Sequence, residues 1–279
     1  MSWTTWIKRP IFLAAVALFC LGGLTTKANL LSTFPQMGDL ERWAVFSLGG
    51  NVTAGDTGTG TSDIFGDVGV AGNGNITLTG TSTIHGNLYY ETRGKLTLSG
   101  KSKITGTIHH DASSDSQLDN GVTEATNTSN AAFALPVTPT YASLTNVQLS
   151  GQQNITISGA PGQTVVLKLQ NFSISSGTFT LSGSATTNFV INVSKQFSLT
   201  NHAQIILTGG VAWDDVLFNI RGGGTDVTMA GGSVLNGILM ANNRTVALSG
   251  QALVRGEVVG DKVSLTGGAQ VNRPPITSP

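Results

Sequence analysis

Residues 75–108 contain one sequence pattern twice, and the second copy follows the first by twenty positions. In each copy apolar or small residues take every second position and polar residues stand between them, which is the period of a strand with one buried face. The first copy has Ile76, Leu78, Gly80, Ser82, Ile84, Gly86 and Leu88, and the second has Leu96, Leu98, Gly100, Ser102, Ile104, Gly106 and Ile108. A unit this short buries its apolar face only by stacking on further copies, as in a solenoid.

The same alternation appears at 64–70 and resumes over 147–271. Asn201 stands where other copies have a turn glycine, and asparagine tolerates the left-handed backbone conformation best after glycine. We expect successive coils to pair in parallel with right-handed crossovers. The predicted fold is all-β, a right-handed parallel β-helix (β-solenoid) of roughly ten coils about 4.8 Å apart with one flanking α-helix. We expect residues 29–279 to form a single domain.

The pattern is interrupted at residues 111–134. This segment is polar, and Leu118, Val122, Ala125 and Ala132 recur in it at helical spacing,. We predict an amphipathic helix near 114–134 that lies on the side of the solenoid, and Pro136 ends it. The alternative is a long loop.

Residues 1–28 have the order of a secretory signal: Lys8 and Arg9, an apolar run over 11–24, and a small-x-small site at 26–28,. An uncleaved membrane anchor is the alternative, and a lipoprotein signal at Cys20 is weakly matched. Cleavage takes the 15 basic residues to 12 against 15 acidic ones and removes the single cysteine. This balance gives no reason to bind nucleic acid. We expect export, and membrane contact only through an uncleaved signal.

The residues that carry catalytic or metal chemistry are few. His109, His110 and Asp111 are adjacent, but neighbouring strand residues point to opposite faces and no second ligand cluster completes a metal site. Asp214, Asp215 and Asp226 with Arg221 are the candidates for a polysaccharide-cleaving site, but they fall in turns. We therefore predict no catalytic, cofactor-binding or metal-binding residues, no cofactor and no enzyme activity.

The outward hydroxyl rows are the remaining candidate. Thr77 is expected to stack over Thr97, and Thr79 over Ser99, in a regular array able to organise water or to contact a glycan. The alternative interpretation is that these rows bind nothing and that threonine is present because it suits an exposed strand. We favour it because Lys101, Lys103 and Arg255 interrupt the outer surface and because later coils lose the threonines.

Residues 214–271, the early FGDVGV and the FVINVS strand resemble bacterial ice-binding-like adhesive domains, including the choice-of-anchor A group. The matching motifs are Phe218-Asn219, Gly237 to Asn242 and Gly256 to Gly260. This resemblance implies an exported β-solenoid with a helix along its side, often on bacterial surfaces. No ice-site motif can be transferred to the sequence, and no sorting signal follows Val271.

The function expected from the sequence is a secreted or cell-surface, non-enzymatic β-solenoid with an adhesive, surface or matrix role. Its partners would be a surface glycan or a matrix component. The alternative is an ice-binding protein of the antifreeze type, with ice as the partner. The second alternative is a polysaccharide-active β-helix enzyme.

Overall fold

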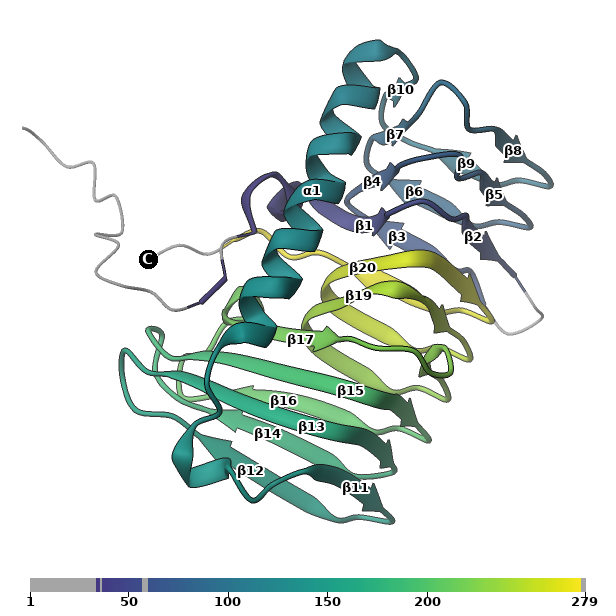
Figure 1. Ribbon diagram of the computed structural model, residues 1–279. Helices are drawn as coiled ribbons and strands as arrows, with labels where there is room; N and C mark the ends of the chain where they lie inside the picture. The colour runs from purple at the N-terminus through teal and green to yellow at the C-terminus, as the bar shows by residue number, and fades with distance from the viewer. Residues whose placement is uncertain (1–33, 36, 57–59, 277–279) are drawn as a thin grey trace, which may run out of the picture. The chain divides into compact units, whose positions relative to one another are not determined.

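The repeat folds into coils of three short strands that pair in parallel with the coils above and below (Figure 1). The computed structural model describes residues 34–35, 37–56 and 60–276. The predicted signal peptide, 1–28, lies outside them. In the doubled stretch Ile76 pairs with Leu96 and Leu78 with Leu98, so the two copies lie in register.

The strands fall into two blocks along the chain. The first block comprises β1 (Trp43–Ser47), β2 (Val52–Gly55), β3 (Asp63–Phe65), β4 (Asp67–Val70), β5 (Ile76–Leu78), β6 (Thr83–His85), β7 (Leu88–Tyr90), β8 (Leu96–Leu98), β9 (Lys103–Ile104) and β10 (Ile108–His109). The second comprises β11 (Asn146–Ser150), β12 (Asn154–Ser158), β13 (Thr164–Ser175), β14 (Thr178–Ser182), β15 (Asn188–Thr200), β16 (Gln204–Thr208), β17 (Val216–Ile220), β18 (Val227–Met229), β19 (Val234–Leu248), β20 (Leu253–Thr266) and β21 (Gln270–Asn272). The long strands β13, β15, β19 and β20 continue around a corner and contribute to two faces.

The order of coils in space differs from their order in the sequence. Strand β1 pairs with β20 on one side and with β4 on the other, and β2 lies in the same way between β20 and β5. The last coil of the chain therefore supports the first, which Figure 1 shows as purple strands beside yellow ones. Successive coils pair in parallel as expected, and at this junction coils far apart in the sequence pair in parallel too. The physical cause is the helix, which returns the chain from one end of the stack to the other.

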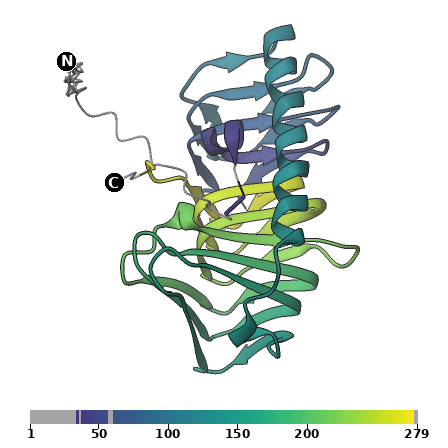
Figure 2. The ribbon, with the colours of Figure 1, turned by 60° about the vertical axis from the view of Figure 1, so that its left-hand side comes forward.

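The helix α1 (Ala112–Ala134) covers one face of the solenoid along much of its length (Figure 2). The Asp111 side chain caps it by accepting a hydrogen bond from the Ser114 N–H at 2.9 Å,. A Cβ added at Gly121 would lie 2.7 Å from the Phe46 ring, so glycine at this position lets α1 pack closely on the helix face. The predicted helix over 114–134 is thus present, and the alternative of a long loop is excluded.

Each of the three faces is defined by its strands. The helix face, under α1, consists of β1, β4, β7, β10, β17 and residues 164–169, 188–193, 237–241 and 256–260. The hydroxyl face consists of β2, β5, β8, β11, β18 and residues 171–175, 196–200, 245–248 and 263–266. The mixed face consists of β3, β6, β9, β12, β14, β16, β21 and residues 234–236 and 253–255. The last two are named for the outward side chains described below.

Two apolar layers hold this arrangement. The inward residues of all three faces form one continuous core, in which Phe172 and Phe197 stack with ring centroids 5.2 Å apart. A second layer lies between α1 and the helix face and includes Phe46, Leu118 and Met240. Burial of such side chains is the main stabilising term in a protein of this kind.

Three short 3-10 helices complete the described elements: η1 (Gly38–Arg42), η2 (Pro139–Tyr141) and η3 (Trp213–Asp215). Within the described residues, no helix has both the length and the apolar character needed to cross a membrane.

Candidate functional site

The hydroxyl face carries three straight rows of outward side chains, because alternate residues of nine stacked strand segments point to solvent. The register between strands fixes which residues belong to each row. From the lower end in Figure 1 to the upper, the central row is Gln148, Ser173, Ser198, Thr228, Ala247, Ser264, Thr53, Thr77 and Thr97.

The rows on either side of the central row differ in chemistry. The corner row, next to the mixed face, is Ser150, Ser175, Thr200, Ala230, Ser249, Thr266, Gly55, Thr79 and Ser99. The edge row, on the side toward the helix face, is Asn146, Asn171, Gln196, Asp226, Thr245, Lys262, Asn51, Asn75 and Lys95. Small hydroxyl or methyl side chains therefore dominate two adjacent rows, and the charged residues of the face are confined to the third.

The sequence-predicted residues Thr77, Thr79, Thr97 and Ser99 lie in the upper coils of the central and corner rows. Sequence reasoning missed most of the remaining members, such as Thr53, Ser264 and Ser198. The signal that identifies them is a serine or threonine between two apolar residues in each coil, as in Val52-Thr53-Ala54 and Val263-Ser264-Leu265.

Hydrogen bonds between coils hold several of these polar side chains in place. The Thr53 hydroxyl donates to the Ser264 hydroxyl at 3.0 Å, across the junction between the first and last coils. Lower on the face, the Asn171 side-chain amide donates to the Asn146 side-chain oxygen at 2.8 Å. Contacts of this kind restrict the rotamers of these outward side chains, so this part of the face is ordered.

The charges that seemed to interrupt the outer surface lie elsewhere. Lys103 and Arg255 belong to strands of the mixed face, and Lys101 lies in the turn that leads to it. The later coils also keep hydroxyls on the hydroxyl face, at Thr200, Thr228 and the serines beside them. The first sequence argument against a binding role therefore does not apply to the hydroxyl face, because the chain turns a corner between residues that are close in sequence. The second applies in part, since serine or alanine replaces threonine in many of the later coils.

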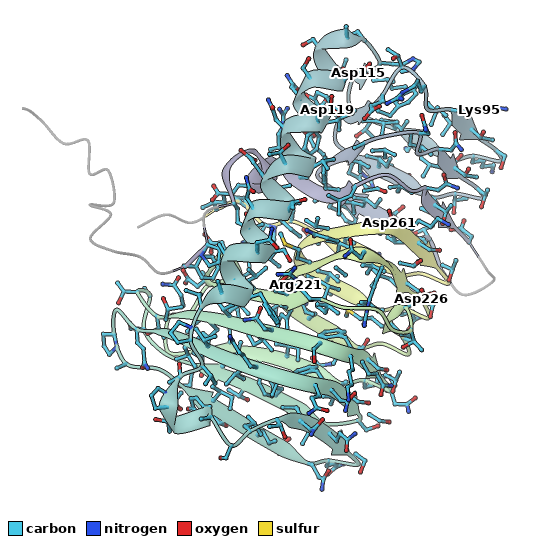
Figure 3. The ribbon with its side chains drawn as sticks, in the orientation of Figure 1. Lys95, Asp115, Asp119, Arg221, Asp226 and Asp261 are labelled. Carbon is cyan, nitrogen blue, oxygen red and sulfur yellow. The ribbon has the colours of Figure 1, made fainter. Side chains whose placement is uncertain are left out.

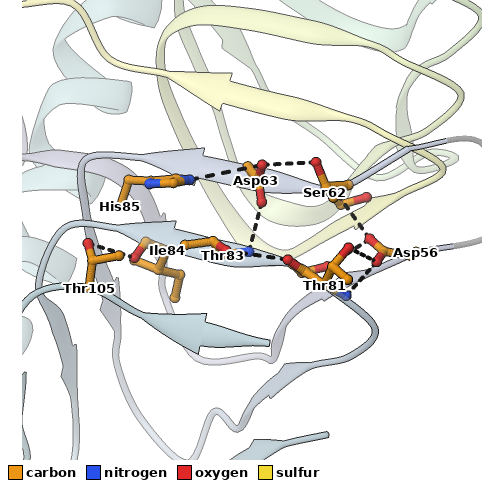
Figure 4. Close-up of polar contacts among 10 residues, drawn as sticks. Asp56, Ser62, Asp63, Thr81, Thr83, Ile84, His85 and Thr105 are labelled. Carbon is orange, nitrogen blue, oxygen red and sulfur yellow. Dashed lines mark hydrogen bonds and ion pairs between the residues drawn. The ribbon is translucent and has the colours of Figure 1, made fainter. Parts of the chain in front are cut away.

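The mixed face presents a less regular surface. Phe65 and His85 stack there with ring centroids 4.4 Å apart, and the His85 Nε2 lies 4.0 Å from an Asp63 carboxylate oxygen. Figure 4 shows this region and the corner beside it, where Asp56 accepts hydrogen bonds from the N–H and the hydroxyl of Thr81. The Thr81 hydroxyl, followed by backbone N–H donors, lowers the pKa of Asp56.

The candidate metal residues have structural contacts. The His109 ring stacks on Tyr89 and the His110 ring on Tyr90, at 4.2 and 4.1 Å between centroids. Asp111 caps α1, and hydrogen bonds from Ser114 lower its pKa. In the part of the chain that the structure describes, no group of three or more His, Cys, Asp or Glu side chains could hold a metal ion.

The structure does not bring the candidate catalytic acids together. Asp214 and Asp215 lie in η3, at the corner between the mixed and helix faces, and Asp215 accepts a hydrogen bond from the Ala212 N–H at 2.9 Å. Asp226 lies at a different corner, beside the hydroxyl face. Arg221, labelled with Asp226 in Figure 3, packs over the Phe133 ring of α1 at 4.8 Å. No paired carboxylates therefore arise from these residues.

The model of a family described as ice-binding-like matches residues 51–271. No curated protein matches the chain. The leading sequence expectation, an adhesive, surface or matrix protein that binds a glycan or matrix component, is overturned by the family match, which favours the alternative of ice binding.

Solved structures resemble the fold at low sequence identity. A glycosylated ice-binding protein from an Arctic yeast gives a TM-score of 0.59 at 17% identity, covering 88% of this chain and 96% of that one. An ice-binding protein from the Antarctic ascomycete Antarctomyces psychrotrophicus gives a TM-score of 0.53 at 20% identity, covering 85% of this chain and 97% of that one. An ice-binding protein from an Antarctic biological consortium gives a TM-score of 0.57 at 18% identity, covering 85% of this chain and 90% of that one.

Proposed function

The chain belongs to the ice-binding-like family, and from this premise we propose that it binds ice through the hydroxyl face. The observation that carries the proposal is the pair of adjacent rows, central and corner, in which small hydroxyl and methyl side chains repeat over nine stacked segments. The partner is the surface of an ice crystal.

The spacing of these rows suits a crystalline ligand. Neighbouring strands lie about 4.8 Å apart, and outward residues along one strand about 6.6 Å apart, since each residue rises about 3.3 Å. Ice is a periodic lattice of water, so a surface that recognises it must be flat and regular over many repeats. Threonine supports this with a hydroxyl that bonds water and a methyl group that excludes disordered water.

The other two faces are less suited to this role. Helix α1 covers the helix face, and Val190, Leu217 and Ile238 there are buried beneath it. The mixed face carries the large or charged side chains of Phe65, His85 and Arg255, which break a regular array. Only the hydroxyl face combines regularity with exposure.

The test compares a bulky substitution on each exposed face. Thr77 in β5 and Thr180 in β14 are both half-buried outward threonines, one on the hydroxyl face and the other on the mixed face. We expect Thr77→Tyr to reduce thermal hysteresis and ice-recrystallisation inhibition several-fold, because the bulky ring prevents the neighbouring side chains from contacting the ice surface. Thr180→Tyr should leave both activities unchanged.

Three outcomes would contradict the proposal. A protein with no thermal hysteresis and no effect on recrystallisation would refute ice binding itself. Equal loss in both variants would point to general destabilisation, which circular dichroism melting detects. Loss in Thr180→Tyr alone would move the site to the mixed face.

The proposal also covers the finer features of the protein. We propose that the protein is non-enzymatic and exported, that residues 1–28 are its signal peptide, and that residues 29–279 form one domain. We further propose that the solenoid is right-handed with roughly ten coils, on the strength of the repeat and the usual hand of parallel crossovers.

A further inference from the structure

The upper end of the stack leaves part of the core uncovered. This open end consists of β8, β9 and β10, the last coil of the first block, at the top in Figure 1. The side chains of Leu98 and Ile108 are 44% and 45% exposed, although Leu78 and Leu88 in the coil below are fully buried. Among the described residues, the open end therefore has both an apolar surface and strand edges without a neighbouring strand, which are the features of a surface prone to pairing.

The opposite end is closed by the chain itself. The segment 138–144 crosses it, and Tyr141 and Leu144 pack against the core. The Tyr141 hydroxyl accepts a hydrogen bond from the Ser158 N–H at 2.8 Å and donates to the Ser158 carbonyl at 2.9 Å. In the described part of the chain, the strands β11 and β12 at this end pair on one side only, with β13 and β14, but the apolar core beneath them is covered. The two ends therefore differ in exposed apolar surface, and contact between two open ends is the end-to-end contact that joins two exposed apolar surfaces,.

The coil at the open end differs from its neighbour by three lysines. At the equivalent positions, twenty residues earlier in the repeat, the coil below has neutral residues. The replacements are Asn75 by Lys95, Thr81 by Lys101 and Thr83 by Lys103. These are all the lysines in the first block of strands, and each lies at or next to a strand of the open end.

One of these lysines also ends a ladder of side-chain acceptors. Asn51 accepts a hydrogen bond from the Asn75 N–H at 2.9 Å, and Asn75 accepts one from the Lys95 N–H at 3.0 Å. An ammonium group donates but cannot accept, so the Lys95 side chain offers no acceptor to the N–H groups of a further coil.

From these observations we propose that the open end is a self-complementary surface that Lys95, Lys101 and Lys103 keep from pairing with a second copy. Two open ends brought together would place six ammonium groups next to one apolar contact, and the desolvation of those charges opposes the contact. The occupant that the lysines exclude is another copy of this chain. This inference does not depend on ice binding.

No acid among the residues that the structure describes forms an ion pair with Lys95, Lys101 or Lys103. Asp111 is engaged with the N–H and hydroxyl of Ser114, and Asp115 with those of Thr92. Both carboxylates lie at the corner where α1 begins. Lys95, Lys101 and Lys103 lie on or beside the hydroxyl and mixed faces.

The test returns the open end to the residues of the coil below, in the triple variant Lys95→Asn, Lys101→Thr and Lys103→Thr. Light scattering after size-exclusion chromatography is expected to give a monomer for the wild type and twice that mass for the variant. The control variant changes Lys168, Lys195 and Lys262 to Asn. It loses the same charge away from the open end and should remain a monomer.

If the neutral triple variant folds poorly, a charge-reversal variant provides a second test. The variant with Lys95, Lys101 and Lys103 changed to Glu should be monomeric alone and should form a one-to-one complex with the wild type. The proposal is overturned if the neutral variant is folded and monomeric, if the control variant associates equally, or if the mixture forms no complex.

Discussion

The side-chain oxygen of Asn75 accepts a hydrogen bond of 3.0 Å from the backbone N–H of Lys95, one coil above it. The Asn75 N–H in turn donates to the Asn51 side chain at 2.9 Å. At this corner the strand ladder cannot satisfy these N–H groups, so side chains do so. The stack is therefore joined at its corners as well as along its strands.

The first prediction concerns this corner. Asn75→Ala removes one acceptor and should lower the free energy of unfolding by about 1 kcal/mol, because the bond is exposed to water. Asn75→Asp keeps an acceptor oxygen and should cost less. Urea unfolding of the two variants measures the difference, and equal stabilities would show that the side-chain bond contributes nothing.

The second prediction concerns the attachment of α1. The buried side chain of Asn219 accepts from the Ser129 hydroxyl at 2.8 Å and donates to the Asn192 side chain at 2.7 Å and to the Ser129 carbonyl at 3.0 Å. Asn219→Ala leaves these partners unsatisfied inside the protein, at a cost of about 1–3 kcal/mol. Hydrogen exchange of the α1 amides should become faster.

Asn242 provides the matched control for that substitution. Its side chain makes one hydrogen bond to α1, to the Ala125 carbonyl at 2.8 Å, and it is half-buried. Asn242→Ala should therefore destabilise the protein less than Asn219→Ala. The reverse order in a urea titration would refute the view that Asn219 is the centre of the network.

The third prediction is a pH dependence set by Glu257. This side chain is 1% exposed, and burial raises its pKa to about 8, although Arg273 donates to it at 2.9 Å. In the unfolded chain the carboxyl ionises near 4.5. Between these values the unfolded state has lost the proton that the folded state keeps, so the free energy of unfolding must fall as pH rises.

Substitution of Glu257 isolates this contribution. Glu257→Gln keeps an acceptor for Arg273 and cannot ionise, so its unfolding free energy should match that of the wild type below pH 4.5 and exceed it increasingly up to pH 8. The difference between the two pKa values corresponds to an unfolding free energy that is higher in Glu257→Gln than in the wild type by on the order of 4–5 kcal/mol at pH 8,. Parallel pH profiles in urea titrations would refute the assignment.

The sequence predicts the coils because side-chain alternation is a local property. Ile76 and Leu96 stack in the predicted register, and Asn201 adopts the predicted left-handed conformation, with φ of 51°. The contact between Val45 and Val258 could not be predicted in this way. All coils present similar apolar edges, so the repeat does not specify which coil lies next to which.

Face assignment was the second feature that the repeat did not determine. Thr97 and Lys103 are six residues apart and lie on different faces, because the chain turns at Gly100, with φ of 71°. Without the position of that corner, the lysine seemed to interrupt the threonine row. The candidate site was therefore only partly predictable, although each of its residues follows the two-residue alternation.

The last prediction separates the rows of the hydroxyl face. Ala247 in the central row and Thr245 in the edge row lie two residues apart on β19, and both are half-buried. Ala247→Lys places a hydrated charge between Thr228 and Ser264, where it must prevent close contact with a flat crystal, so thermal hysteresis should be lost. Thr245→Lys adds the same charge to a row that already holds Lys262 and should reduce hysteresis much less. Equal effects at the two positions would mean that the central row is not the contact surface.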